Sequence, residues 1–465
     1  MAITIEQQAY SKEAVGTNTQ SDVQPVYTPA VFTVSSTKSS ELNFRFVADV
    51  YINGSKRVRL KYVPNTINYG VIDVTQILID FCQSQVNGHN SGVASGSSAK
   101  GNVTSNNVPH SIHQIDEYSR NDNVMIDWHV MFGEEYQLAS DELPIIYEGT
   151  SDTAGEPAKQ SNPNFQSWNS VFGQFVDLMN KDISTYILSS SQNEVMSSLP
   201  YTVNRKIGRD DYHTFTIFNG KNGDNNISRP DKMNVRTYNS AGTQLQFFQK
   251  TNTNLNGGAP YGSTTYDGEK NLLFVGCGTQ NFANGSTPIS ANATYYTIQF
   301  VQGGVGRSRL YRFDLNDCDT IPSPFTQYRL GWLNKFGGFD YYTFTMKSEK
   351  SFDIERQTFM QTVGTYQDAS FFFQEGDFGR SDFNVDARQK LVLQSDWLVD
   401  GEVEMIKECF MSPRVWLIES LSQGDRVFPV NVQATNFVEY NQKDDKVFQY
   451  ELEVTFSHKH RIQNG

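Results

Sequence analysis

Several common features are missing from this sequence, and each absence excludes a class of protein. No apolar run approaches the roughly 20 residues that a helix needs to cross a bilayer, so we expect no membrane span. The opening residues, MAITIEQQAYSKEAVG, have neither a basic segment nor an apolar core, which argues against a secretory signal. Basic residues are in the minority, with 38 Lys and Arg against 51 Asp and Glu and a net charge of -13, which argues against specific nucleic-acid binding.

Cysteine is scarce and shows no paired spacing. The 4 cysteines, Cys82, Cys277, Cys318 and Cys409, lie far apart in the sequence and form no CxxC motif. This spacing argues against metal ribbons and redox motifs, so we expect reduced thiols, with a bridge between Cys277 and Cys318 as the open alternative. The phosphate-binding GxxxxGK[ST] motif and the catalytic motifs GxSxG and HExxH are also missing from the sequence.

The polar clusters that remain have ordinary structural interpretations. His110 and His113 lie in a polar loop without a nearby cysteine, which makes them poor metal ligands. The adjacent pair Asp210 and Asp211 is typical of a turn, because acid and base catalysis needs separated and partly buried carboxylates. The oxygen-rich segment 219–231 lacks the order of a calcium loop. We therefore predict no catalytic, cofactor-binding or metal-binding residue, and no enzyme.

What the sequence does contain is a series of short apolar alternations bounded by turn residues. The clearest spans 44–62, where apolar residues alternate from Phe44 to Ile52, Asn53-Gly54 forms a tight turn, and the alternation resumes at Val58. The chain is 38% hydrophobic and 13% aromatic, so large rings supply much of the apolar area for its cores. These patterns predict a mainly β protein with multiple β-sandwich domains.

Composition also predicts how the chain is divided. We expect a polar N-terminal arm (1–26), a β-rich domain with long polar loops at about 87–109 and 148–164 (27–213), a middle β-sandwich (214–318), a proline-containing linker (319–326) and a C-terminal β-sandwich (327–465).

Three helices interrupt the predicted strands. One contains Ile77, Leu78 and Phe81 and is capped by Asp73 or Thr75. A second is expected near WNSVFGQFVDLMNKDI. The third, at about 398–411, has apolar residues at helical spacing and ends before Pro413; it is the single packed helix of the C-terminal domain.

The stretch YRLGWLNKFGGFDYYTFTMKSEK, at 328–350, is the most distinctive in the chain. Its aromatics could form an exposed platform for a sugar. The alternative is structural, since YYTFTMK alternates like a half-buried strand and the preceding glycines and asparagine suit a corner. We favour the corner, and its marker residues are Trp332, Asn334, Gly337, Gly338, Phe339, Asp340 and Phe344.

With these residues placed, the chain resembles a family of virion proteins of tailed phages infecting Bacteroidetes-type bacteria. The resemblance rests on VYTPAVFTVSS with FRFVADVYING and YGVIDVTQIL, on HVMFGEEYQ with TIFNG, on the stretch at 328–350, and on LVLQSDWLVDGEVEMIKECFMSPRVWLI with DDKVFQYELEVTF. The chain departs from the family in its Gly, Ser and Asn loop at 87–109 and in DRVFPVNVQATNF.

The resemblance implies a structural component of the neck, tail or baseplate, with a C-terminal sandwich similar to that of tail-tube proteins. Such proteins assemble as rings of six-fold or twelve-fold symmetry and contact other virion proteins, which implies a virion location after assembly in the host cytoplasm. The alternative function is a carbohydrate-binding adhesion protein of a fibre or spike, using exposed aromatics and the middle sandwich.

Overall fold

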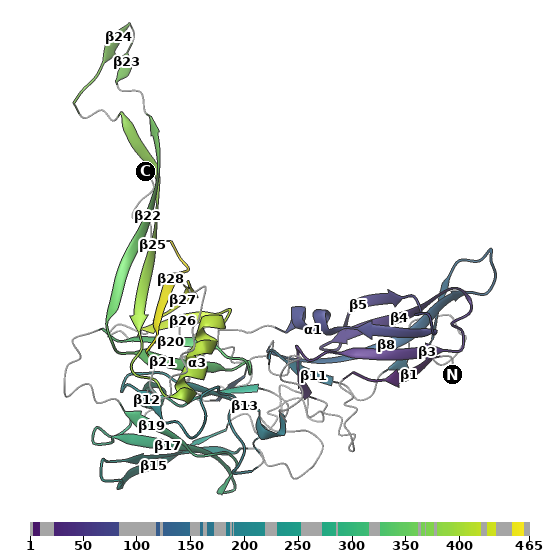
Figure 1. The fold of residues 1–465 in the computed structure, drawn as a ribbon, viewed down its shortest axis with the longest axis horizontal. Coiled ribbons are helices and arrows are strands. Elements are labelled where there is room, and N and C mark those ends of the chain that lie inside the picture. The colour runs from purple at the N-terminus through teal and green to yellow at the C-terminus, as the bar shows by residue number, and fades with distance from the viewer. Residues whose placement is uncertain are drawn as a thin grey trace, which may run out of the picture. The chain divides into compact units, whose positions relative to one another are not determined.

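The computed structural model divides the chain into two compact units. The first contains residues 1–201, 212–313 and 335–339, and the second contains 202–211, 314–334 and 340–465. The structure describes residues 3–9, 23–82, 118–120, 124–148, 159–160, 165–171, 183–186, 188, 190–218, 230–252, 272–284, 287–315, 326–360, 364–367, 369–375, 379–419, 426–433 and 449–459. Sheets account for most of the secondary structure, which confirms the mainly β fold with multiple sandwiches (Figure 1).

The first unit begins with a sandwich of two sheets. One sheet has the order β1 (Ile3–Gln7), β3 (Val31–Ser36), β6 (Tyr69–Asp73). The other runs β2 (Val23–Pro25), β11 (Phe165–Trp168), β8 (Met125–Gln137), β4 (Leu42–Ile52), β5 (Ser55–Tyr62), with β9 (Ile145–Glu148) and β10 (Lys159–Gln160) also paired to β8. The short helix α1 spans Thr75–Phe81, and a 3-10 turn spans Ile183–Tyr186.

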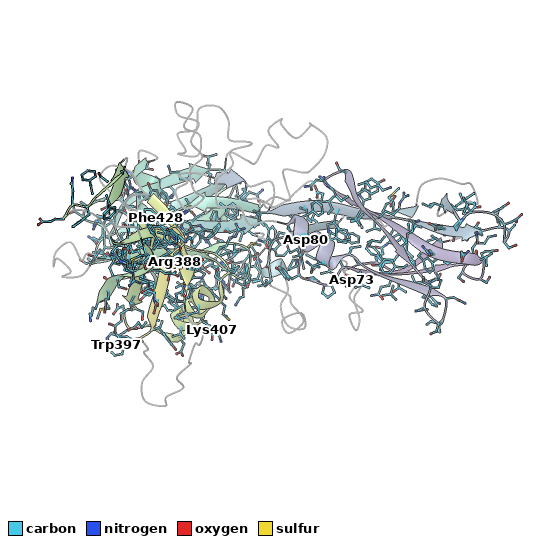
Figure 2. The ribbon with its side chains drawn as sticks, turned by 90° about the horizontal axis from the view of Figure 1, so that it is seen from above. Asp73, Asp80, Arg388, Trp397, Lys407 and Phe428 are labelled. Carbon is cyan, nitrogen blue, oxygen red and sulfur yellow. The ribbon has the colours of Figure 1, made fainter. Side chains whose placement is uncertain are left out.

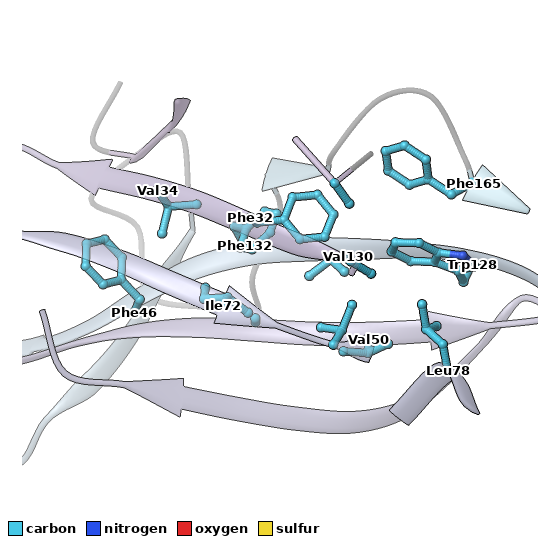
Figure 3. Packing of buried hydrophobic residues seen from close by; sticks show 14 of the residues in the cluster. Phe32, Val34, Phe46, Val50, Ile72, Leu78, Trp128, Val130, Phe132 and Phe165 are labelled. Carbon is cyan, nitrogen blue, oxygen red and sulfur yellow. The ribbon is translucent and has the colours of Figure 1, made fainter. Parts of the chain in front are cut away.

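Aromatic rings from both sheets form the core of this sandwich (Figure 3). Phe32 of β3 lies with its ring centroid 5.1 Å from that of Phe132 and 6.2 Å from that of Trp128, both on β8. Phe165 of β11 packs on the same Phe32 ring at 6.1 Å. Each of these four side chains is 0 or 1% exposed, so a few large rings fill most of the space between the sheets.

The predicted hairpin at 44–62 is confirmed. β4 and β5 pair antiparallel around Asn53 and Gly54, which have φ of 49° and 74°, as a tight hairpin turn requires. The alternating residues from Phe44 to Ile52 are buried. They face the core because the strand period of two places them on one side of the sheet.

The expected N-terminal arm is wrong for the residues that the structure describes. Ile3–Gln7 form strand β1, which pairs with β3, and Val23–Pro25 form β2, which pairs parallel to β11. Ile3 is fully buried. The alternation in ITIEQ is too short to stand out in a sequence, and only pairing with β3 makes it a strand.

The helices expected in this unit have different outcomes. The helix at Thr75–Phe81 is confirmed, and Asp73 accepts a hydrogen bond from the Thr75 backbone N–H at 2.9 Å just before it. The helix expected near WNSVFGQF is wrong at its start, because Trp168 ends strand β11, which pairs with β8. The rest of that segment, 172–182, and the loops at 87–109 and most of 148–164 lie outside the described residues.

A second sandwich follows in the same unit. One sheet has the order β13 (Thr214–Phe218), β16 (Leu272–Gly276), β7 (Tyr118–Arg120). In the other, β19 (Tyr311–Leu315), β17 (Tyr295–Gln302), β14 (Lys232–Tyr238) and β15 (Gln244–Thr251) are hydrogen-bonded in that order, and β18 (Val305–Gly306) pairs with β17. Helix α2 spans Thr279–Asn284. Phe215 of β13 contacts the rings of Tyr311 and Phe313 at 5.1 and 5.6 Å, which places the core between the two sheets.

The second unit is built on a seven-stranded antiparallel sheet. Its order is β21 (Phe339–Phe344), β20 (Tyr328–Leu333), β26 (Val415–Glu419), β27 (Arg426–Val432), β28 (Glu451–Phe456), β25 (Arg380–Gln394), β22 (Ser348–Met360). β23 (Thr365–Gln367) and β24 (Ser370–Phe372) form a separate small hairpin, and β12 spans Arg205–Ile207. Residues 202–211 were expected in the N-terminal domain, but the structure groups them with this unit.

Helix α3 spans Asp400–Met411 and matches the predicted helix closely. Its buried side includes Val403, Ile406 and Cys409, three of the four apolar residues whose spacing predicted it; the fourth, Phe410, is half-buried. Glu402 accepts a hydrogen bond from the Val399 backbone N–H at 3.0 Å, which satisfies one donor at the start of the helix. Figure 2 marks Trp397 ahead of this helix and Lys407 within it.

Candidate functional site

The stretch at 328–350 is structural, as its alternation suggested. Trp332 lies on β20 and is 0% exposed, and Phe344 at the end of β21 is 2% exposed. The rings of Tyr341 and Tyr342 on successive faces of β21 are also buried, so both faces of the strand are covered. The expectation of a half-buried strand is therefore wrong, and a sugar platform on these rings is excluded because the rings do not reach the surface.

The corner between β20 and β21 needs its glycines. Gly337 has φ of 79°, and a Cβ placed there would lie 1.9 Å from the backbone oxygen of Asn169. A Cβ on Gly338 would lie 2.7 Å from Oγ1 of Thr216. Trp168 donates its indole N–H to the backbone oxygen of Phe336 at 2.8 Å. Residues 335–339 thus pack inside the first unit, where no larger side chain fits.

The other marker residues hold this corner and its strands. Asn334 donates its side-chain amide to the carboxylate of Asp340 at 2.9 Å, and both side chains are buried. Phe339 packs with its ring centroid 5.8 Å from that of Phe274. Every marker residue therefore has a packing or hydrogen-bonding position that accounts for it, and together they form a corner and two strands.

The titratable candidates from the sequence also have structural positions. Asp211 accepts a hydrogen bond from the Gly208 N–H at 2.8 Å and pairs with Arg329 at 3.3 Å, which makes it part of a turn. His213 is buried with its ring edge against Phe313. Cys277 is fully buried, and Cys318 lies outside the described residues, so the bridge between them stays an untested alternative. Among the described residues no group of three or more His, Cys, Asp or Glu could hold a metal ion.

Other candidates fall outside the described residues. These are the loop histidines His110 and His113 and most of the oxygen-rich segment, 219–229. The described helices include none long and apolar enough to cross a membrane.

The feature that sequence reasoning missed is a long β-ribbon in the second unit, formed by β22 and β25. The two strands pair continuously from Ser348 with Leu393 to Met360 with Arg380. β28 pairs with β25 only over Lys390–Gln394, so the ribbon beyond Gln389 is two strands wide (Figure 1). We call the part formed by Phe352–Met360 and Arg380–Gln389 the arm.

Exposed apolar side chains are concentrated in the arm and in the β23–β24 hairpin beyond it. Nine of the 25 exposed large hydrophobic residues among those described lie between 352 and 385, although this segment is a small part of the chain. They are Phe352, Ile354, Phe359, Met360, Phe371, Phe372, Phe373, Phe383 and Val385. Scattered apolar residues are normal on a surface, but a contiguous group marks an interaction site.

One face of the arm continues the core of the sheet. Leu391 and Leu393 are buried at 1% and 0% exposure, and residues two apart on a strand share a face. The same face therefore carries Val385 farther out on β25, and Phe352 and Ile354 on β22. Phe352 is 47% and Ile354 is 55% exposed. We call Phe352, Ile354, Val385, Ala387 and Gln389 the apolar face of the arm; Arg356, opposite Val385, lies on the same side and marks its charged outer end.

The opposite face of the arm is charged. Lys390 pairs with Asp353 at 2.8 Å and with Glu453 at 3.2 Å, and Lys459 pairs with Asp386. The hydrogen bonds that Lys390 donates to Asp353 and Glu453 raise the pKa of Lys390 above its ordinary value. A solvated, ion-paired face opposite an apolar one is the pattern of a strand pair that is covered on one side only.

The free edge of the ribbon is protected by charge. The β22 segment SEKSFDIERQTFM contains Glu349, Lys350, Asp353, Glu355 and Arg356. Charged side chains along an edge discourage a further strand from adding to it. The arrangement favours docking through the apolar face over extension of the sheet by an unrelated strand.

The arm could have been found from its alternation. FDI on β22 and FNVDA on β25 place an apolar residue at every second position, which is typical of strands. Exposure could not be read from the same pattern, since a half-buried strand and an uncovered strand look alike in sequence. No family model matches the chain, and no similar protein was found among curated sequences.

Proposed function

We propose that this chain is a non-enzymatic structural protein that assembles with copies of itself through its arm. The observation that carries the proposal is the apolar face of the arm, which continues the buried face of the seven-stranded sheet into solvent. A two-stranded ribbon is only marginally stable in water without further packing. A neighbouring subunit that covers this face would supply that packing.

A ring is the assembly that fits best with this surface. In the proposed ring the arm of one copy docks on a different surface of the next copy, so the contact is heterologous and repeats head to tail until it closes. A two-fold contact between identical arms is less suitable. Pairing two β22 edges around Ile354 would set Asp353 opposite Glu355 twice, and like charges directly opposite each other destabilise a sheet.

The resemblance of the sequence supports a place in the neck, tail or baseplate of a tailed-phage virion. The net charge of -13 agrees with this setting, because negative walls of a channel that passes DNA do not hold its phosphates. The proposed partners are further copies of the chain in a six-fold or twelve-fold ring, and other virion proteins.

Native mass spectrometry and electron microscopy of the purified full chain test the assembly. We expect a closed oligomer, which the double variant Phe352→Ser with Ile354→Ser reduces to monomers. The matched control is Leu143→Ser, because Leu143 is 84% exposed but lies in the first unit. A strictly monomeric wild-type chain would contradict self-assembly.

Two further results would show which part of the proposal is wrong. If the wild-type ring persists in the double variant, the arm is not the contact. If the ring forms but labelled antibodies find no such protein in purified phage particles, the virion location is wrong and the self-assembly stands.

A further inference from the structure

The outer face of the sheet β19-β17-β14-β15 combines aromatic rings with cations. The inner face of this sheet is core, since Val235, Ile298 and Phe300 are fully buried. The alternate residues point outward, and among them Tyr238 lies directly opposite Tyr295 with ring centroids 4.9 Å apart and planes at 11°. We use "outer face" for this side of the sheet.

Two guanidinium groups lie over aromatic rings on the outer face. Arg312 lies over the ring of Tyr295 at 3.9 Å, and Arg236 lies over the ring of Phe247 at 5.4 Å. Phe247 is 48% exposed and stands directly opposite Arg236 on the neighbouring strand. Cation and ring therefore stand side by side at the surface, each within reach of a bound molecule.

Amide side chains lie on the same face. Gln249 is exposed and donates to the oxygen of Asn234, directly opposite, at 2.8 Å. Asn234 is only 8% exposed, and Gln299 donates its amide to the Ser308 backbone oxygen at 3.1 Å, so Gln249 is the amide within reach of a ligand. Amides offer donors and acceptors together, which suits hydroxyl groups. A carbohydrate site has two parts: aromatic rings that pack on the apolar side of the sugar, and polar groups such as amides that hydrogen-bond its hydroxyls.

The charge of these strands indicates whether the carbohydrate is neutral or acidic. On the outer face, β14, β15 and β17 contribute Lys232 and Arg236 and no aspartate or glutamate, and β19 adds Arg312 and Asp314, in a chain with 51 acidic residues. Arg236 makes no ion pair with any residue that the structure describes. A surface that is locally positive on an acidic protein is complementary to a negatively charged ligand.

We infer that the outer face binds a polysaccharide that carries carboxylate groups, with Phe247 and Tyr238 packing on sugar rings and Arg236 pairing with a carboxylate. A nucleic-acid strand fits less well. It carries a charge on every nucleotide and is held by many Lys and Arg contacts, whereas the outer face has few cations and the whole chain is acidic. The inference does not depend on ring assembly.

The test uses the full chain, a glycan array and titration calorimetry with three probes. The probes are oligogalacturonate as the acidic sugar, a dextran oligosaccharide as the neutral sugar, and an oligothymidylate strand. We expect binding of oligogalacturonate that weakens at high salt, with a dissociation constant at least tenfold higher in Arg236→Gln and in Phe247→Ala.

Control variants separate binding from folding. Arg236→Lys keeps the charge and should restore part of the affinity, while Phe372→Ala removes an aromatic of similar exposure, 57%, in the β23–β24 hairpin and should change nothing. Three outcomes would overturn the inference: no acidic glycan bound on the array, equal affinity in wild type and Phe247→Ala, or tighter binding of dextran or oligothymidylate than of oligogalacturonate. Ring assembly is read separately by native mass spectrometry, so failure of one proposal is distinguishable from failure of the other.

Discussion

Two strands of the same length show what separates the core of this protein from its exposed part. β8 and β22 each span 13 residues and pair antiparallel with a long neighbour. Most of β8 is buried, because strands lie on both of its edges and a second sheet covers one face. Nearly every residue of β22 is exposed, and in the described part of the chain β22 pairs with β25 alone.

The difference lies in what surrounds each strand, and composition alone does not explain it. Phe352 and Ile354 on β22 are as apolar as Phe132 and Val130 on β8. An apolar strand face contributes to stability only when another element covers it and removes it from water. The covered face of β8 therefore stabilises the folded chain, whereas the apolar side chains of β22 stay exposed and would contribute only in an assembly. The following variants test that contrast, beginning with the largest effect on stability.

The largest loss is expected when a ring is removed from β8. Phe132 is 1% exposed and packs against Phe32, so Phe132→Ala leaves a cavity and should lower the free energy of unfolding of this sandwich by about 4 kcal/mol. Denaturant unfolding followed by fluorescence measures it. Phe132→Leu keeps most of the apolar volume and should recover more than half; a loss under 1 kcal/mol in Phe132→Ala would mean that the site can collapse.

The next largest effect is expected at a glycine in the packed corner. Gly337→Ala forces a Cβ against the Asn169 backbone oxygen at φ of 79°, and should cost about 3 kcal/mol. Gly364 also has positive φ, 96°, and a Cβ there would meet the half-exposed ring of Phe371 and, at 2.7 Å, the backbone oxygen of Phe372. Both obstacles belong to the small β23–β24 hairpin, which is separate from the seven-stranded sheet, so the strain is confined to that hairpin. We expect Gly364→Ala to leave the melting temperature of the main transition unchanged; equal effects of the two substitutions would contradict the contrast.

A buried ion pair comes third. Burial by itself would raise the pKa of Asp49, but hydrogen bonds from Arg59 and Lys56 outweigh it, so the pKa lies below its ordinary value of 3.8. A depressed carboxyl pKa stabilises the fold above the unfolded-state pKa, and this stabilisation is lost as the pH falls through the folded-state pKa.

Asp49→Asn should therefore cost about 2 kcal/mol at pH 7, with the gap to wild type narrowing below pH 3.8. Urea unfolding at several pH values measures this gap. The matched control on the arm is Asp353→Asn, since Asp353 is exposed and its pair with Lys390 is solvated. It should leave stability unchanged at every pH, and a pH-independent gap for Asp49→Asn would contradict the assignment.

The smallest effect on the isolated subunit is expected on the arm. Phe352→Ala removes an exposed ring, so in dilute monomer the free energy of unfolding should change by less than about 0.5 kcal/mol. At concentrations where the wild type assembles, the same variant should melt earlier, because assembly stabilises only the folded chain. Calorimetric melting at two concentrations measures both, and a large loss in dilute monomer would place Phe352 in the core of its own subunit.

Sequence patterns predicted well wherever a local signal was sufficient. Asn53-Gly54 located the hairpin of β4 and β5, and the spacing of Val403, Ile406 and Cys409 located α3, because turn chemistry and helical period are properties of neighbouring residues. The strands of the middle sandwich were predicted for the same reason, and Asn239 and Gly242 form the turn between β14 and β15. Strand β1 was missed because its five residues gain stability only from β3.

The candidate interaction sites could be predicted only in part. The alternating residues of the arm can be recognised in the sequence, but no local pattern shows that their apolar face is exposed to solvent. The outer face of the middle sheet joins Arg236 to Phe247 and Tyr238 to Tyr295 across separate strands, and the second of these pairs is far apart in sequence. Cross-strand neighbours depend on register, which sequence alone left open.

By itself the sequence determined that this is a β protein, where many of its strands turn, and that the stretch at 328–350 needs glycine at its corner. Only the tertiary structure decided that Trp332 and its neighbours are buried while Phe352 and Ile354 are exposed. The physical reason is that backbone preference acts between neighbours in the chain, whereas burial depends on which distant segment lies across the sheet.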